Sequence, residues 1–151
     1  MQQLDQLEQR IGRLEAVIDR WIVQQGLTYN AFAVLYSLAR ADGGNCTQKD
    51  IGEAWLLPKQ TVFSTCKVLT EQGLLTQQPD NRDKRARQLC LTDAGRAQAL
   101  PLLAAAEAFS ERLFDAFGSE RTAHLLAELD ALNTVAETII NAEENRSCGA
   151  P

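Results

Sequence analysis

The chain has 151 residues, of which 45% are hydrophobic and 23% charged, and its formal net charge at pH 7 is −5. This length fits one domain, or one small domain with extra helices for assembly, and the composition is that of a globular rather than a disordered protein. No apolar run approaches the roughly 18–20 residues that cross a bilayer, and the first residues lack the basic and apolar regions of a signal peptide. We therefore expect a cytoplasmic protein without a membrane partner.

The N-terminal segment predicts an amphipathic helix over residues 3–24. Apolar side chains recur three and four positions apart and form one stripe, made by Leu4, Leu7, Ile11, Leu14, Ile18 and Trp21. Gly26 follows in the position of a C-cap. Such a stripe needs a partner, which is either the rest of this chain or a second subunit.

Three shorter helices are predicted next. The first covers residues 28–41, and its inward-facing side chains are Phe32, Leu35, Tyr36 and Leu38. After a turn at 42–45, Thr47 lies three residues before an aspartate, which is a capping-box-like start for a short helix to Trp55. Pro58 suits the first position of the following helix, which ends before Gly73.

A hairpin follows this pair of short helices. Residues 74–78 and 87–91 are β-prone, and the polar loop 79–86 separates them. Thr92 then caps a long helix that reaches about Phe117, in which Pro101 predicts a kink or a break because its nitrogen carries no hydrogen.

The last predicted helix begins at Ser119. One apolar face of this helix carries Leu125, Leu129, Leu132, Ala136 and Ile139. We expect residues 146–151 to form a disordered tail.

Two short helices joined by a turn and followed by a hairpin predict a helix-turn-helix with a wing. In the second short helix the apolar positions Val62, Cys66 and Leu69 share one face. The remaining faces carry polar side chains that suit the major groove of DNA, namely Lys59, Gln60, Thr61, Ser64, Thr65 and Lys67. Residues 59–96 carry a net charge of +3 and the remainder −8, so a basic segment belongs to an acidic protein.

The loop between the two strands adds a second cluster of cations. Arg82, Lys84 and Arg85 lie in this loop and Arg87 follows at the start of the strand, and the four suit phosphates or a narrow minor groove. Asp80 and Asp83 are placed to orient an arginine. The alternative is a solvated charged loop on an acidic helical protein that acts as an interaction adaptor and binds no DNA.

These segments together resemble the MarR family of transcriptional regulators. The resemblance rests on TQKDIGEA (47–54), PKQTV (58–62), LTEQGLL (69–75), DNRDKR (80–85) and LTDAG (91–95). It implies a mainly α fold with a small β-hairpin wing. A winged helix-turn-helix lobe over 28–100 would be accompanied by dimerisation helices at 1–26 and 101–145.

The resemblance also implies a function and roles for individual residues. The chain would be a homodimeric repressor, released by a small-molecule effector, on a near-palindromic operator in double-stranded DNA. Arg85 would enter the minor groove, with Asp83 orienting it. The major groove would be faced by Gln60, Thr61, Ser64 and Thr65, although Ser64 stands where many members carry an arginine.

A small aromatic or anionic effector would find apolar walls in this chain. The residues predicted for such a pocket are Trp21, Tyr29, Phe32, Tyr36 and Phe109, which could equally fill the hydrophobic core.

Other chemistry is weakly supported by the sequence. The single histidine, His124, lies in a leucine-rich helix, and no metalloprotease, phosphate-loop or nucleophile-elbow motif is present. The four cysteines form no CxxC pair, so we expect neither a metal site nor a cofactor, and no enzyme activity. A cysteine-based redox regulator that uses Cys66 or Cys90 is a further alternative.

Overall fold

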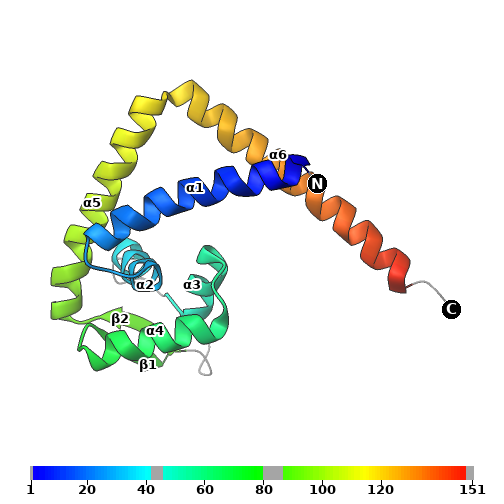
Figure 1. The fold of residues 1–151 in the computed structure, drawn as a ribbon. Coiled ribbons are helices and arrows are strands. Elements are labelled where there is room, and N and C mark those ends of the chain that lie inside the picture. Colours follow the sequence, from blue (N-terminus) through cyan, green and yellow to red (C-terminus); the bar gives the residue numbers. More distant parts are fainter. Residues whose placement is uncertain (1, 42–45, 80–86, 149–151) are drawn as a thin grey trace. The chain divides into compact units, whose positions relative to one another are not determined.

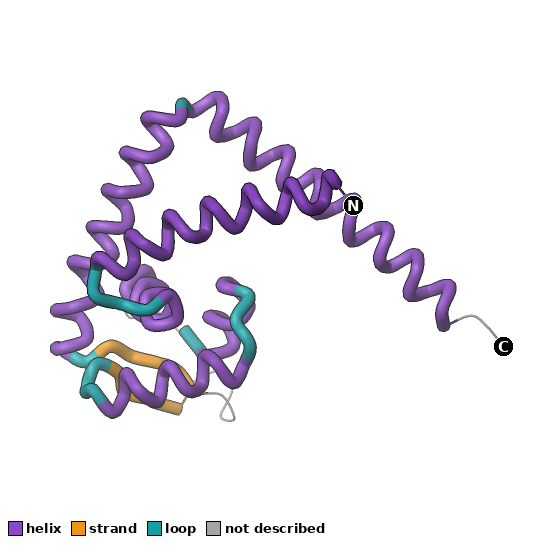
Figure 2. Tube along the Cα trace, viewed as in Figure 1, coloured by secondary structure: helices purple, strands orange, loops and turns teal. Residues whose placement is uncertain are grey.

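The computed structural model describes residues 2–41, 46–79 and 87–148, with side chains omitted at a few of these positions. Figures 1 and 2 show a mainly helical chain with one antiparallel hairpin, as the sequence predicts. The elements are α1 (Gln2–Gln24), α2 (Tyr29–Ala41), α3 (Gln48–Trp55), α4 (Lys59–Glu71), β1 (Leu75–Pro79), β2 (Arg87–Leu91), α5 (Asp93–Phe117) and α6 (Ser119–Cys148). The chain divides into two compact units, 1–105 and 106–151.

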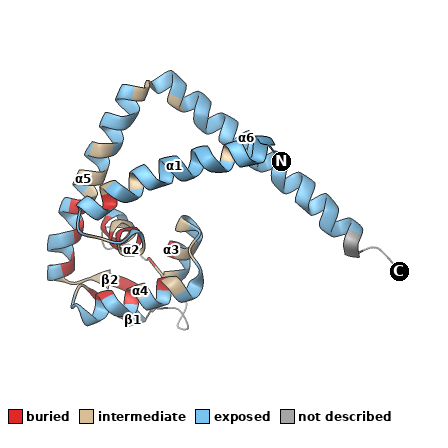
Figure 3. Cartoon of the chain, in the orientation of Figure 1, coloured by how far each residue is buried: buried red, intermediate tan, exposed pale blue. Residues whose placement is uncertain are grey.

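The core of the first unit forms around α2. Most buried residues lie on α2, on the inward faces of α3 and α4, on the sheet and at the start of α5, and Figure 3 draws them in red. Helix α1 contributes only Ile22 to the fully buried set. The stripe predicted along α1 is largely solvent-exposed, with Leu4 at 60% and Leu14 at 53% exposure. The core of the first unit therefore leaves much of this stripe uncovered.

Helix α3 has the predicted capping box at its start. The amide of Asp50 donates to Oγ1 of Thr47 at 3.2 Å, and the amide of Thr47 donates to the Asp50 carboxylate at 2.8 Å. The turn to α4 differs by one residue from our expectation. Pro58 is the N-cap of α4 rather than its first helical residue, because its ψ of 141° is extended.

Leu56, at the end of α3, adopts left-handed backbone angles of φ 51° and ψ 36°. A leucine is strained in this conformation by about 1–2 kcal/mol, and its side chain is 90% exposed, so burial does not offset the strain. We expect Leu56→Asn to raise the free energy of unfolding by about 0.5–1 kcal/mol, because asparagine tolerates this region. Urea unfolding followed by circular dichroism measures the change.

The control is Leu100→Asn, since Leu100 is also an exposed leucine, at 47%, but lies within α5. There asparagine is the poorer helix former, so this variant should lose stability. An equal change in both variants would contradict the explanation by backbone strain.

The hairpin is anchored at its base to the helices around it. Strands β1 and β2 pair from Leu75 opposite Leu91 to Pro79 opposite Arg87. The amide of Leu89 donates to the carbonyl of Cys46 at 2.8 Å, and Thr47 bridges to Gln88, which joins β2 to the start of α3. These two contacts fix the second strand of the hairpin to the residues that begin the helix-turn-helix.

Thr92 connects the end of β2 to the end of α4. Its amide donates to the carbonyl of Leu74 at 3.0 Å, and its hydroxyl donates to the carbonyl of Gly73 at 2.6 Å. The same hydroxyl oxygen accepts the amide of Gly95 at 2.9 Å and so caps α5, as predicted. Gly95 is buried, and a side chain on it would overlap the carbonyl oxygen of Leu74.

Two expectations about the C-terminal helices are corrected. Helix α5 continues past Pro101 without a break, and the proline faces solvent, where water can satisfy the carbonyl that lacks its donor. Helix α6 extends to Cys148, into the segment 146–151 that we expected to be disordered, because alanine and glutamate in 142–144 favour a helix.

The second unit contains the end of α5 and all of α6. Arg121 lies over the ring of Phe117, with its guanidinium carbon 4.3 Å from the ring centroid. Between residues 123 and 146 every side chain of α6 is exposed. The large apolar side chains among them are Leu125, Leu126, Leu129, Leu132, Val135, Ile139 and Ile140.

Candidate nucleic-acid interface

Helix α4 is held by its apolar face, as the sequence predicts. Val62 and Cys66 are fully buried and Leu69 is 3% exposed. This face packs against α2, α3 and β1. The opposite side of the helix is therefore presented to solvent.

The polar residues predicted for DNA contact fall into two groups on α4. Four of them are exposed, namely Lys59, Gln60, Ser64 and Lys67. Thr61 and Thr65 are only partly exposed, since they flank the buried face. The four exposed residues are thus the better placed for a groove.

The hydroxyl groups on α4 are oriented by the helix itself. Oγ of Ser64 and Oγ1 of Thr65 both donate to the carbonyl of Thr61, at 3.0 and 2.8 Å. Their hydrogens are used in these bonds, so each oxygen offers lone pairs outward. Gln60 makes no hydrogen bond with the described residues, and its amide can both donate and accept.

The first turn of α4 also offers backbone donors. The N-cap Pro58 makes no side-chain hydrogen bond to the helix, and the first intrahelical bond runs from the amide of Val62 to the carbonyl of Pro58. The amides of residues 59–61 therefore point out of the helix end without intrahelical acceptors. A phosphate of a nucleic acid backbone is a suitable acceptor.

The predicted wing residues Arg82, Asp83, Lys84 and Arg85 lie outside the described residues. What the structure describes is the frame that carries the loop, which begins after Pro79 and ends at Arg87. Both ends are paired with each other at the far end of the sheet. The loop therefore follows directly from the hairpin that packs against α4.

Two exposed apolar residues on α4 were not predicted. Phe63 is 51% and Val68 49% exposed, so neither belongs to the buried face. The sequence did contain a signal for them, because each residue is displaced by about 100° around the helix from the one before it. Phe63 follows the buried Val62 directly and must therefore point away from the core.

Comparison with known proteins assigns the family. The model of the MarR family matches residues 25–86. The solved structure of NMB1585, a MarR family regulator from Neisseria meningitidis, is 51% identical to this chain, with a TM-score of 0.82, and the alignment covers 95% of this chain and 99% of that one. The chain belongs to the MarR family of transcriptional regulators.

More distant structures share the winged-helix fold with this MarR family regulator. The Staphylococcus aureus MepR–DNA complex is 18% identical with a TM-score of 0.70, over 86% of this chain and 93% of that one. A probable transcriptional regulator from Pseudomonas aeruginosa is 25% identical with a TM-score of 0.61, over 83% and 93%. No curated protein matches the chain.

The structure disfavours two of the cysteines as redox sensors in this MarR family regulator. Cys46 and Cys66 are buried, at 7% and 0% exposure. Burial raises the pKa of both thiols to about 11, and the nearby Asp50 carboxylate contributes for Cys46. Cys90 on β2 is only partly buried. Since the thiolate is the reactive form, the two buried thiols are poor nucleophiles at neutral pH.

We expect Cys46 and Cys66 to react with iodoacetamide at least about 100-fold more slowly in the native protein than in the unfolded chain, because a pKa raised by about two units leaves about 100-fold less thiolate. Mass spectrometry of the labelled peptides over time measures each site separately. Equal labelling rates in the native and unfolded protein would contradict the protection by burial and would keep Cys66 as a candidate redox sensor.

The aromatic residues of the first unit form a cluster with Trp55. The ring centroid of Trp55 lies 5.8 Å from those of Tyr29, Phe32 and Tyr36. The indole N–H of Trp55 donates to Oγ of Ser37 at 2.8 Å. Phe32 is also in edge contact with Trp21 at 5.8 Å. The sequence thus predicted four members of the cluster and missed Trp55, which arrives from the neighbouring helix α3. The fifth predicted residue, Phe109, belongs to the second unit.

A cavity of about 550 Å³ opens beside this cluster, between α2 and α3. Tyr36 and Trp55 supply aromatic walls, and Arg40 also lines the cavity, with its guanidinium carbon 5.8 Å from the centroid of the Tyr36 ring. Asp50 is also part of the lining. Of the five aromatic residues predicted for a pocket, only Tyr36 is among those that line this cavity.

The described residues contain no group of three or more histidine, cysteine or acidic side chains suited to a metal ion. None of the helices in the described part of the chain has the length and apolar character needed to cross a membrane.

Proposed function

We propose that this MarR family regulator is a homodimeric repressor that binds double-stranded DNA in the cytoplasm, with α4 in the major groove. One observation carries the proposal, which is that α4 is anchored by Val62, Cys66 and Leu69 and presents Gln60 and Ser64 to solvent. A helix presented in this way fits the roughly 12 Å wide major groove. The acidic adaptor remains the alternative, and it predicts no DNA binding.

The distribution of positive charge also favours the exposed face of α4 as the DNA-binding surface. Lys59 and Lys67 are exposed on α4, and the segment 59–96 is basic within an acidic chain. We infer that Arg82, Lys84 and Arg85 in the loop contact the adjacent minor groove or its phosphates. Basic groups concentrated in this way make the affinity strongly dependent on salt concentration.

The dimer is proposed because two long apolar stripes remain exposed in the isolated chain. One runs along α1 and one along α6, and a soluble protein rarely leaves such areas in contact with water. A second copy of the chain covers both stripes in an isologous interface. The two α4 helices then face half-sites about one DNA turn apart, so the operator is expected to be near-palindromic.

Release by a small molecule is the finer part of the proposal. The cavity beside Trp55 has the size of a ligand site, since such sites measure about 300–1,000 Å³. Arg40 and Tyr36 suit an aromatic or anionic ligand. A screen of aromatic carboxylates by thermal shift, followed by DNA binding, tests it: compounds that stabilise the protein without weakening DNA binding would remove the effector from the proposal.

The test of DNA binding is selection of duplexes from a random library by the purified protein, followed by measurement of affinity at several salt concentrations. We expect an enriched near-palindromic sequence and an affinity that falls steeply with salt. Absence of both enrichment and salt-dependent binding would favour the adaptor.

Base reading by Gln60 is tested on the selected operator. Gln60→Ala is expected to reduce discrimination between the operator and random DNA by about 1–3 kcal/mol, if the amide makes a bidentate contact with adenine. Gln72→Ala is the control, because it removes the same group at the opposite end of α4. An equal loss of affinity for both DNAs would place Gln60 on the backbone instead.

A further inference from the structure

We propose that Phe63 recognises the C5 methyl group of a thymine in the major groove. The inference rests on the proposed DNA binding and adds an apolar contact to the polar face of α4. It predicts that one thymine in each half-site is selected by the phenyl ring rather than by hydrogen bonds.

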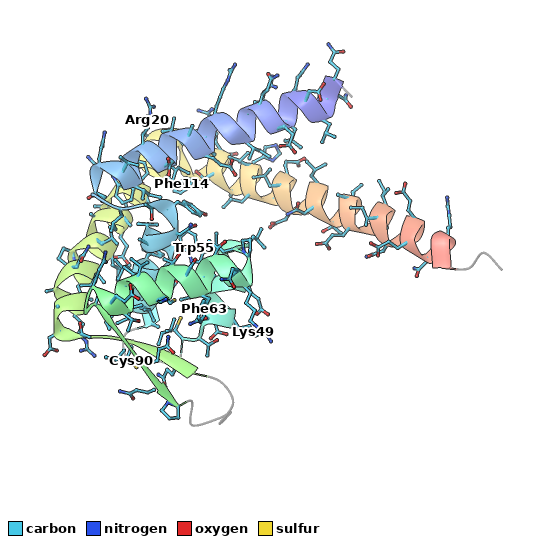
Figure 4. The ribbon with its side chains drawn as sticks, turned by 60° about the horizontal axis from the view of Figure 1, so that its bottom comes forward. Arg20, Lys49, Trp55, Phe63, Cys90 and Phe114 are labelled. Carbon is cyan, nitrogen blue, oxygen red and sulfur yellow. The ribbon has the colours of Figure 1, made fainter. Side chains whose placement is uncertain are left out.

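The burial of α4 shows that Phe63 is not needed for the core. Val62, Cys66 and Leu69 complete the buried face, whereas half of Phe63 is exposed. Phe63 also makes no ring contact with another aromatic side chain among the described residues. Figure 4 shows the side chain on α4. Phe63 is therefore a large, half-exposed apolar side chain that is available for a contact outside the core.

The position of Phe63 along α4 places it with the residues proposed to read DNA. Gln60 lies three residues before it and Lys67 four residues after it, and these spacings bring side chains together on one side of a helix. Phe63 is also in the first half of the helix, and recognition helices contact base edges with their N-terminal residues.

The chemistry of the major groove offers Phe63 one kind of apolar partner. Among the groups that distinguish the bases there, the hydrogen-bond donors and acceptors are polar and the thymine methyl group is apolar. Covering this methyl group with the phenyl ring removes apolar surface of both molecules from water. The other bases lack this methyl group, so the ring would bury less apolar surface against them, which yields selectivity for thymine.

The test uses the duplex selected by the wild-type protein. Each thymine is replaced in turn, in both half-sites, by deoxyuridine, which lacks only the methyl group. At one symmetric pair of positions we expect the affinity to fall about fourfold for each methyl group removed, the factor expected for burial of one such group. Phe63→Ala is expected to lose a similar or larger factor on the thymine duplex and to bind the thymine and uracil duplexes equally well.

Two control variants test whether the preference for thymine depends on the side chain of Phe63. Phe63→Leu retains an apolar contact and should keep part of the preference for thymine, whereas Val68→Ala removes the other exposed apolar side chain of α4 and should leave the preference unchanged. The uracil series on the wild-type protein needs no variant, so it is decisive even if Phe63→Ala fails to fold. Insensitivity of the wild type to every uracil, or full sensitivity in a folded Phe63→Ala, would overturn the proposal. Binding of the thymine duplex by the wild type would still support DNA binding as the function.

Discussion

Gly95→Ala is expected to lower the free energy of unfolding of the first unit by about 3 kcal/mol, the upper end of the usual cost of overpacking. A methyl group at this position would overlap the carbonyl oxygen of Leu74 and lie 3.2 Å from Cδ2 of Leu91. The carbonyl cannot withdraw freely, because it accepts the amide of Thr92. The overlap therefore has to move the start of α5 away from the base of the hairpin.

The change is measured by urea unfolding, with the hairpin contact reported by hydrogen exchange of the Thr92 amide. Gly12→Ala is the matched control, since Gly12 lies within α1 and a methyl group there meets no atom within 4 Å. This control should gain about 0.5–1 kcal/mol from its better helix propensity. A Gly95→Ala protein as stable as the wild type would show that the close contact between α5 and Leu74 is not required.

The double variant Leu14→Glu with Leu129→Glu is expected to be monomeric and to bind the selected operator at least about 100-fold more weakly. A monomer engages only one half-site, and linking two binding sites commonly contributes a factor of 10²–10⁴. Leu14 and Leu129 are 53% and 38% exposed in the isolated chain, so the charges do not disrupt its core. Analytical ultracentrifugation measures the oligomeric state, and fluorescence anisotropy with a labelled operator measures the affinity.

The control carries the same two charges outside the apolar stripes. Gln9→Glu with Thr134→Glu places them on the polar sides of α1 and α6, and it should remain dimeric with only a modest loss of affinity. A monomeric wild type, or a dimeric double variant at Leu14 and Leu129, would contradict the proposed interface.

The features that the sequence predicted correctly are governed by local rules. The capping box of Thr47 depends on residues three positions apart, and the buried face of α4 depends on helical periodicity. The hairpin follows from two β-prone runs with a polar loop between them. In each case the determining residues are close together in the chain, so the pattern can be recognised without coordinates.

The features that were missed depend on residues from separate elements. Trp55 joins the aromatic cluster only because α3 packs against α2, and its indole then finds Ser37. Leu56 shows no sequence preference for the left-handed region, and the turn imposes it. Of the kink or break expected at Pro101, the break was wrong, because the helix on both sides of an exposed proline outweighs one lost hydrogen bond. The requirement for glycine at 95 becomes clear only when Leu74 is placed beside it.

The anchoring of the hairpin has a consequence for how regulators of this kind can diverge. The hairpin is bonded through Leu89 to Cys46, which precedes α3, and Thr92 bonds to Gly73 and Leu74, which follow α4, and caps α5. All of these bonds lie outside the segment 80–86, and the last pair of the sheet, Pro79 with Arg87, closes the frame. A change in the sequence between these two paired residues therefore leaves each of these hydrogen bonds in place. Under the DNA binding proposed above, the segment that carries Arg82, Lys84 and Arg85 can thus change its preference for DNA while the hydrogen bonds of Leu89 and Thr92 are kept.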